Sequence, residues 1–234
     1  MFYREAGDFS TTYREDSQTF PIKFDRYRYY AVLLIAFAII PFLLNDYWVN
    51  AIFLPFLIYS IAAIGLNILT GYCGQVSLGT GGFMAVGAYA TYKLMTAFPE
   101  VSMVVHILLA GGITAFVGVL FGLPSLRIKG FYLAVATLAA QFFLVWLFNR
   151  VPWFYNYSAS GQINSPERTL FGIPITGANT EPWAVYLFCL VFVTLSAIIA
   201  RNLTRGAMGR KWMAIRDMDI AAELIGIKPL NTKL

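Results

Sequence analysis

Six long, mostly apolar runs limit what this chain can fold into. They occupy residues 29–48, 51–69, 81–98, 101–123, 131–148 and 183–200. A helix needs about twenty such residues to cross a hydrocarbon core of roughly 30 Å. Hydrophobic residues make up 59% of the chain and charged residues 12%, outside the range of soluble domains. The sequence therefore predicts an all-α, polytopic membrane protein with about six transmembrane helices.

The distribution of lysine and arginine predicts the orientation of these helices. Five of these residues precede the first run, two lie between the fourth and fifth runs, and seven follow the sixth. With six spans all fourteen fall on one side, and loops rich in basic residues are typically cytoplasmic. Both ends are therefore predicted to be cytoplasmic. The net charge of +5 is spread over these membrane flanks, so it does not indicate a nucleic-acid partner.

The same pattern divides the chain into three parts. Residues 1–28 are mixed in charge and lack the apolar core of a signal peptide, so we expect a cytoplasmic N-terminal tail. Residues 29–200 form the predicted transmembrane domain. Residues 201–234 form a predicted cytoplasmic segment.

Glycines are concentrated in GLNILTGYCGQVSLGTGGFMAVGAYATY, residues 65–92, where two apolar helices should meet. Lipid cannot satisfy free backbone N–H and C=O groups, so an interrupted helix must be buried in protein or line a wet path. The end of such a helix can also face an anionic carboxylate. The candidate pathway residues are Asn67, Gly71, Gly74, Gln75, Ser77, Gly79, Gly81 and Gly82. A tight turn that serves only helix packing remains an equal alternative.

A short amphipathic helix is predicted near the C-terminus. Asp217 and Asp219 suit a helix start, whereas Gly226 followed by Pro229 suits a stop. Three apolar residues between them share one helix face, and they are Ile220, Leu224 and Ile227. Such a helix can dock on another protein.

Enzymatic and metal-binding signals are weak. The chain has one histidine, His106, and no paired carboxylates within an apolar run. Its cysteines, Cys73 and Cys189, suggest neither a disulfide framework nor a metal site. No GxxxxGK[ST] motif occurs, so this chain has no P-loop for nucleotide phosphates. Any energy source must therefore lie on a partner.

Four separated motifs resemble one transporter family. They are the glycine-rich segment, LPSLRIKGFYLAVATLA at 123–139, FGIP at 171–174 and GRKWMAIRDMDIAAELIGI at 209–227. Together they resemble the permease subunits of branched-chain amino-acid ABC importers, in particular the M-type subunit of the leucine/isoleucine/valine system.

The resemblance implies an inner-membrane subunit that passes hydrophobic amino acids inward. Its implied partners are cytoplasmic ABC ATPase subunits, a homologous second permease and a periplasmic amino-acid-binding protein. ATP and magnesium would bind on the ATPase, and this chain would hold no cofactor. The implied ATPase-coupling residues are Arg216, Asp219, Ala221, Ala222, Glu223, Leu224 and Gly226.

One departure from the family and three alternatives remain. Family members continue past the coupling loop with further membrane helices, whereas this sequence ends at Leu234, so we expect a C-terminally truncated chain. A urea or short-amide importer has a similar permease. A standalone channel or ion-coupled carrier would need no ATPase. A membrane scaffold is a third alternative, although a scaffold has no need of a broken helix.

Overall fold

The computed structural model describes residues 11–12, 23–43, 45–126, 132–158, 160, 163–170, 172–177, 180–229 and 232. Most of the predicted tail lies outside the described residues, as do Arg127, Lys129 and Lys233. Residues 23–28, which we assigned to the tail, are already helical.

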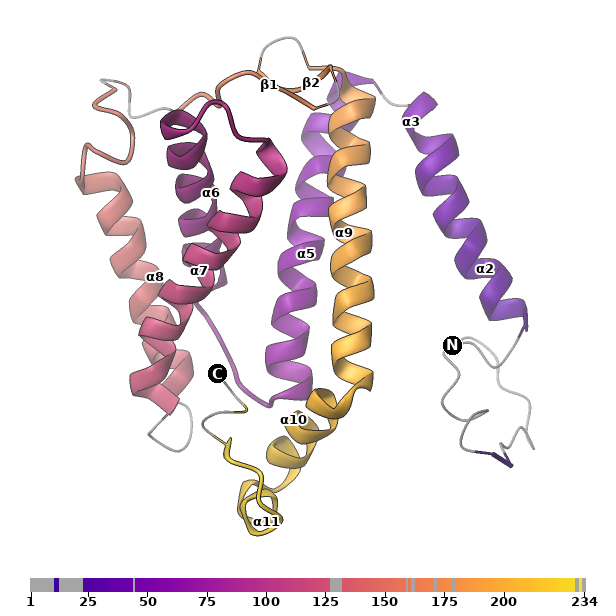
Figure 1. The fold of residues 1–234 in the computed structure, drawn as a ribbon, viewed down its shortest axis with the longest axis vertical. Helices are drawn as coiled ribbons and strands as arrows, with labels where there is room; N and C mark the ends of the chain where they lie inside the picture. The colour runs from indigo at the N-terminus through magenta and orange to yellow at the C-terminus, as the bar shows by residue number, and fades with distance from the viewer. Residues whose placement is uncertain are drawn as a thin grey trace.

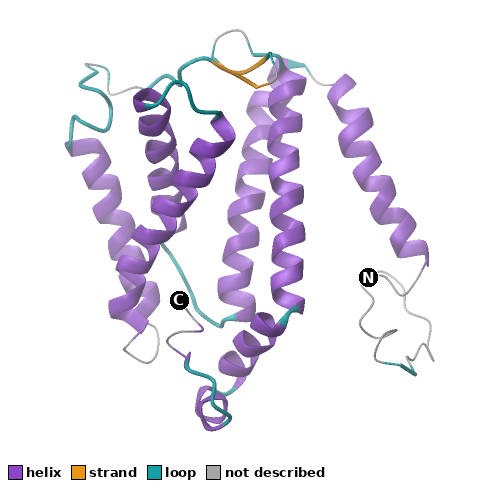
Figure 2. Cartoon of the chain, in the orientation of Figure 1, coloured by secondary structure: helices purple, strands orange, loops and turns teal. Residues whose placement is uncertain are grey.

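Long helices make up most of the described chain (Figures 1 and 2). The α-helices are α2 (Lys23–Leu34), α3 (Ile40–Leu43), α4 (Asp46–Trp48), α5 (Leu54–Asn67), α6 (Thr80–Ala97), α7 (Met103–Leu126), α8 (Tyr132–Arg150), α9 (Pro182–Arg205), α10 (Ala207–Asp217) and α11 (Asp219–Leu224). Three π-helical turns continue them, η1 (Ile35–Ile39), η2 (Val49–Phe53) and η3 (Ile68–Tyr72).

The first boundary between spans differs from the prediction. One continuous helix runs to Leu43, and the next begins at Asp46, so residues 46–48 belong to the second helix. Asn45 is extended, with φ −95° and ψ 162°, and Asn45 and Asp46 are poor residues for the middle of an apolar helix. Local polarity thus ends the first helix five residues early.

The prolines within the first two apolar helices follow π-helical turns. η1 precedes Pro41 in α3, and η2 precedes Pro55 in α5. Proline cannot donate the helical hydrogen bond and its ring crowds the preceding turn. A widened turn at that point keeps each helix continuous.

Helices α5 and α9 lie side by side in one group (Figure 1). Their buried core contains Val49, Leu57, Tyr186 and Leu190. The Tyr186 hydroxyl donates to the Ala36 carbonyl over 3.2 Å, so the phenol ties α9 to η1.

Helices α6, α7 and α8 pack on one another in a second group (Figure 1). Val86, Leu144 and Phe148 form its buried cluster. The Tyr89 ring stacks on Phe148 with centroids 4.3 Å apart, and Phe154 meets both rings edge-on.

The long connection between α8 and α9 contains a two-stranded antiparallel hairpin that the sequence did not indicate. It pairs β1 (Arg168–Leu170) with β2 (Ile173–Thr176). The Arg168 guanidinium donates to the carbonyls of Met95 and Pro99, where α6 ends. The hairpin therefore closes one end of the molecule, opposite α10 and α11 (Figure 1).

Five helices of the described chain are long and apolar enough to cross a membrane. They run over Phe24–Leu43, Asp46–Tyr72, Met103–Leu123, Tyr132–Arg150 and Pro182–Arg205. The all-α membrane class is confirmed, but the count of six is not. The third predicted span corresponds to α6, whose glycines, tyrosines and Lys93 lower its hydropathy.

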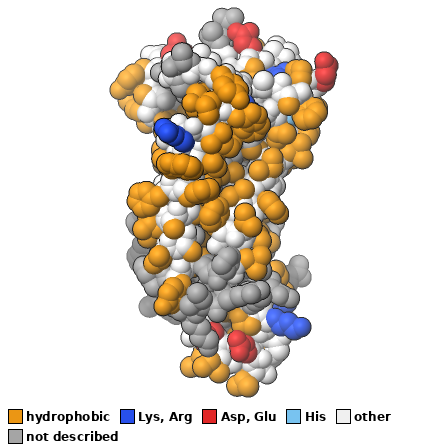
Figure 3. Space-filling model, turned by 90° about the vertical axis from the view of Figure 1, so that its left-hand side faces the viewer, with side chains coloured by type: hydrophobic (Ala, Val, Ile, Leu, Met, Phe, Trp, Pro, Cys, Tyr) orange, Lys and Arg blue, Asp and Glu red, His pale blue; other side chains and the backbone are white. Residues whose placement is uncertain are grey.

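The surface agrees with a membrane setting. Large apolar side chains such as Phe42, Phe56, Phe116 and Phe142 are 66–89% exposed. Figure 3 shows hydrophobic side chains over the middle of one face, with charged side chains toward the two ends.

Candidate functional site

The glycine-rich segment forms an irregular connection between α5 and α6. Helical structure ends with η3, residues 73–79 have no regular structure, and α6 begins at Thr80. Gly74 has φ +67°, a left-handed conformation that favours glycine. The expected interruption is therefore present. Cys73 and Gln75 are buried, whereas Asn67 is exposed at the end of α5.

The second half of this connection packs tightly on α8. The Leu78 N–H donates to Thr137 Oγ1 over 3.0 Å, and the Gly82 N–H donates to Gln141 Oε1 over 2.8 Å. Free N–H groups at the start of α6 are thus satisfied by side chains of another helix.

Close approach explains three of the predicted pathway glycines. A Cβ at Gly79 would lie 2.5 Å from the Thr137 carbonyl oxygen, and a Cβ at Gly81 would lie 2.9 Å from Gln141 Nε2. A Cβ at Gly82 would lie 3.1 Å from Gln141 Cα. The described contacts of these glycines are helix packing, the alternative that the sequence left open.

Sequence reasoning missed Thr137 and Gln141. A signal was present, because these two polar residues stand four apart in the apolar run 131–148 and so share one helix face. The sequence did not indicate which segment would lie opposite them.

The first half of the connection contacts α10. Arg216 Nη1 donates to the Gly71 carbonyl over 2.6 Å, and a Cβ at Gly74 would lie 2.6 Å from Arg216 Cγ. The Arg216 guanidinium also pairs with Asp217 at 2.9 Å. The structure thus brings two predicted pathway residues against a predicted coupling residue.

The predicted C-terminal helix corresponds to α11, and a helix that was not predicted, α10, precedes it. α10 ends at Asp217 and α11 begins at Asp219, because Met218 between them is extended with φ −158°. The predicted start at Asp219 is confirmed, and its carboxylate accepts the Ile220 N–H over 2.9 Å. The predicted stop at Gly226 is confirmed by its φ of +87°.

The other predicted coupling residues divide into a buried side and an exposed side of α11. Ala222 is buried, whereas Ala221 and Glu223 are exposed. Leu224 is 84% exposed. Two further apolar side chains, Ile220 and Ile225, are also exposed at this end of the molecule (Figure 1).

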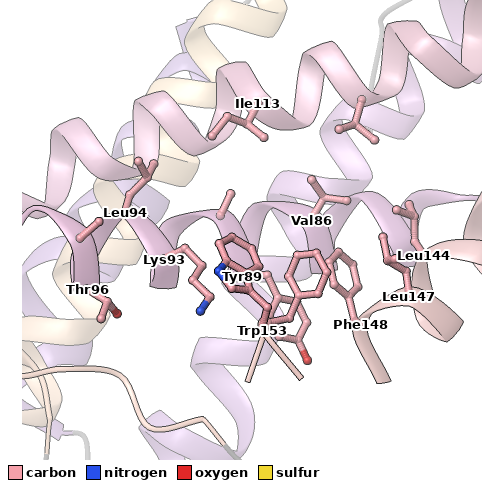
Figure 4. Close-up of a pocket in the computed structure, with 14 residues that line it drawn as sticks. Val86, Tyr89, Lys93, Leu94, Thr96, Ile113, Leu144, Leu147, Phe148 and Trp153 are labelled. Atoms are coloured by element: carbon pink, nitrogen blue, oxygen red, sulfur yellow. The ribbon is translucent and has the colours of Figure 1, made fainter. Parts of the chain in front are cut away.

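An apolar cavity of about 610 Å³ opens within the group of α6, α7 and α8 (Figure 4). Its walls include Val86, Ile113 and Leu144. Lys93 is the charged residue among the described residues that line it, and its Nζ lies 4.3 Å from the centroid of the Trp153 ring. A lysine within an apolar run often marks a functional position, so the sequence already carried a signal at Lys93.

No group of histidine, cysteine or acidic residues that could hold a metal ion occurs among the described residues. His106 is buried, and both ring nitrogens have no hydrogen-bond partner within the described chain. The connection between α5 and α6 itself presents glycines and main-chain groups, with Arg216 against them.

Comparison with known proteins assigns the family. Residues 49–234 match the model of the branched-chain amino acid transport system permease component. The chain belongs to this permease family.

Two curated relatives are both named high-affinity branched-chain amino acid transport system permease protein LivM. The relative from Salmonella typhimurium is 33% identical over 198 residues, and the relative from Escherichia coli K12 is 32% identical over the same length. Each match covers 76% of this chain and 46% of the relative, so the chain spans less than half the length of these relatives. No solved structure matches this chain significantly.

The family match includes every element from η2 to the C-terminal helices of this permease chain. Both the glycine-rich connection and α10–α11 therefore lie within the shared region, and α2 lies outside it.

Proposed function

We propose that this chain is a transmembrane permease subunit of an ATP-driven importer for branched-chain or other hydrophobic amino acids. Family membership supports the reaction class. ATP and magnesium would bind on separate cytoplasmic ABC subunits. This chain would contribute the path through the membrane and the surface that the ATPase moves.

The contact between Arg216 and Gly71 carries this proposal. It links α10 to the connection that joins α5 to α6, across 145 residues of sequence. A displacement of α10 would therefore move the main chain at Gly71, in the connection between α5 and α6. Alternating access needs such a mechanical link between a motor and the helices that flank the path.

Exposed apolar residues in α11 and directly after it support docking of the ATPase there. Ile220, Leu224 and Ile225 are 62–84% exposed at an end of the molecule beyond the membrane-spanning helices. A cluster of this kind on a soluble surface indicates an interaction site. In this proposal α10 and α11 face the cytoplasm, in agreement with the excess of basic residues after α9.

The apolar cavity beside Lys93 supports a hydrophobic substrate. Its walls can accept an aliphatic side chain, and the Lys93 ammonium can attract a carboxylate. The cavity is lined by the last turns of α6, whose end is joined to the hairpin by Arg168. In this proposal that end faces the periplasm and receives the amino-acid-binding protein. The homologous second permease would complete the path.

ATP-driven leucine uptake tests the coupling role. The chain would be co-reconstituted with its ATPase subunits, second permease and binding protein in liposomes. Arg216→Gln removes the bond to Gly71 and should lower uptake about tenfold, because loss of a charge-assisted hydrogen bond costs about 1.5–3 kcal/mol. Asp217→Asn removes the ion pair of Arg216 but keeps the bond to Gly71, so it should transport nearly as the parent does.

Full uptake by Arg216→Gln, with ATPase bound, would remove the coupling assignment. Uptake of urea in place of leucine would indicate the short-amide importer. Flux driven by an ion gradient without nucleotide would indicate a carrier.

A further inference from the structure

A second cavity, of about 680 Å³, lies where α5, α9 and α10 meet. Among the described residues that line it, the charged ones are Arg201, Arg205 and Arg210. Asn67 and Thr204 are uncharged polar residues of its lining, and Ala200 is one of its apolar residues. We call it the basic cavity.

Helix geometry gathers the three arginines. Arg201 and Arg205 are four residues apart and so share one face of the last turns of α9. α10 then begins directly after Gly206, and a Cβ at Gly209 would overlap the Thr204 carbonyl group. Only glycine at 209 lets α10 press against the end of α9. Because the two helices approach so closely, Arg210 of α10 lies beside the end of α9 and lines the cavity. Its Nη1 donates to the Arg205 carbonyl over 3.3 Å.

Among the described residues that line this cavity, the charged ones are all arginines, whereas the acidic residues Asp217, Asp219 and Glu223 of the same end of the molecule do not line it. Arginine presents a planar fork of donors that matches phosphate oxygens, and Thr204 and Asn67 can add neutral hydrogen bonds. The lining therefore fits a phosphate group.

The position of the cavity favours a lipid over a soluble anion. α9 has 24 residues. At 1.5 Å per residue such a helix is about 36 Å long, which exceeds a hydrocarbon core of roughly 30 Å. Its last turns therefore reach head-group depth. Apart from Met213, the apolar residues of the cavity come from α5, η3 and α9, within the membrane-spanning segments, so a bound acyl chain would follow them into the bilayer.

We propose that the basic cavity binds the phosphate of an anionic phospholipid, with the acyl chains along α5 and α9. Basic pockets between membrane helices are known to hold such head groups. A bound lipid would join α9 to α10 at the point where the chain leaves the membrane. This site is independent of the transport reaction proposed above.

Lipid retention by the full chain tests the site. The purified chain in detergent would be titrated with phosphatidylglycerol and with phosphatidylcholine of the same acyl chains, and bound lipid counted by native mass spectrometry. Phosphatidylglycerol should be retained in preference. Loss of each arginine should weaken phosphatidylglycerol binding about fivefold, because one basic residue near an anionic lipid surface contributes about 1 kcal/mol.

Two double variants are compared, and each removes two positive charges from the end of the molecule that contains α10 and α11. Arg205→Gln/Arg210→Gln should lose the preference for phosphatidylglycerol, whereas Lys211→Gln/Lys228→Gln should keep it, because neither lysine lines the cavity. Equal loss in both pairs, or equal retention of the two lipids by the parent, would overturn the proposal. Circular dichroism and gel filtration establish that each variant is folded.

A third variant separates a lipid from a soluble phosphate. Ala200→Phe blocks the apolar wall and leaves all three arginines in place, so phosphatidylglycerol retention should fall several-fold. Inorganic phosphate should compete only weakly with the lipid. If inorganic phosphate displaces phosphatidylglycerol at equal concentration, or if Ala200→Phe changes nothing, the ligand is not a lipid and the proposal fails.

Discussion

At the scale of single residues, Gly74 is the position where backbone and packing both demand glycine. Its φ is +67°, and a Cβ there would lie 2.6 Å from Arg216 Cγ. The left-handed conformation alone costs an ordinary residue about 1–2 kcal/mol. Gly74→Ala should therefore lower the melting temperature of the chain in detergent and weaken the contact between Arg216 and Gly71.

Gly65 provides the matched control for that substitution. It lies within α5, and a Cβ there would meet nothing within 4 Å. Gly65→Ala should leave the melting temperature unchanged or raise it slightly, since alanine favours helix by about 1 kcal/mol over glycine. The explanation for Gly74 is wrong if both substitutions have the same effect.

At the scale of elements, α6 depends on α8 for its first turn. No side chain of its own caps α6, and Gln141 Oε1 accepts the Gly82 N–H over 2.8 Å instead. Gln141→Leu leaves that N–H without a partner, which costs about 1–3 kcal/mol. Hydrogen exchange of the amides at 78–82 should become faster in this variant.

The neighbouring Phe142 supplies the control for α6. It is 69% exposed and lies on another face of α8. Phe142→Ala should leave exchange at 78–82 unchanged. Unchanged exchange in Gln141→Leu would show that the cap does not hold the first turn of α6.

At the scale of the whole molecule, the two ends should lie on opposite sides of the membrane. The hairpin end and the α10–α11 end are the opposite ends of the structure (Figure 1). Ser165→Cys and Glu223→Cys place exposed thiols at these ends. In a background with Cys73→Ser and Cys189→Ser, an impermeant maleimide should label position 165 in spheroplasts and position 223 only after permeabilisation.

This labelling tests the orientation predicted from lysine and arginine. The reverse pattern would place α10 and α11 in the periplasm, where no ATPase could reach them. Labelling of both positions from one side would contradict the arrangement in which the hairpin and α10–α11 lie at opposite ends of the membrane-spanning helices.

Patterns that act over one or two turns were visible in the sequence. Apolar run length indicated all five membrane-spanning helices, although the boundary between the first two lies five residues earlier than predicted. Gly226 correctly indicated the end of α11. The boundary at Asn45 was missed because it depends on a single residue leaving helical geometry. The roles of Asn67, Gln75 and Ser77 in a substrate path stay predictions.

The sequence by itself determined the membrane class, the permease family and the position of the glycine interruption, because hydropathy and glycine content act locally along the chain. Only the tertiary structure decided what the interruption touches. Gly79 and Gly82 meet α8, whereas Gly71 and Gly74 meet Arg216 of α10. Those contacts join residues more than fifty positions apart, and their partners are set by the packing of whole helices, which no local pattern encodes.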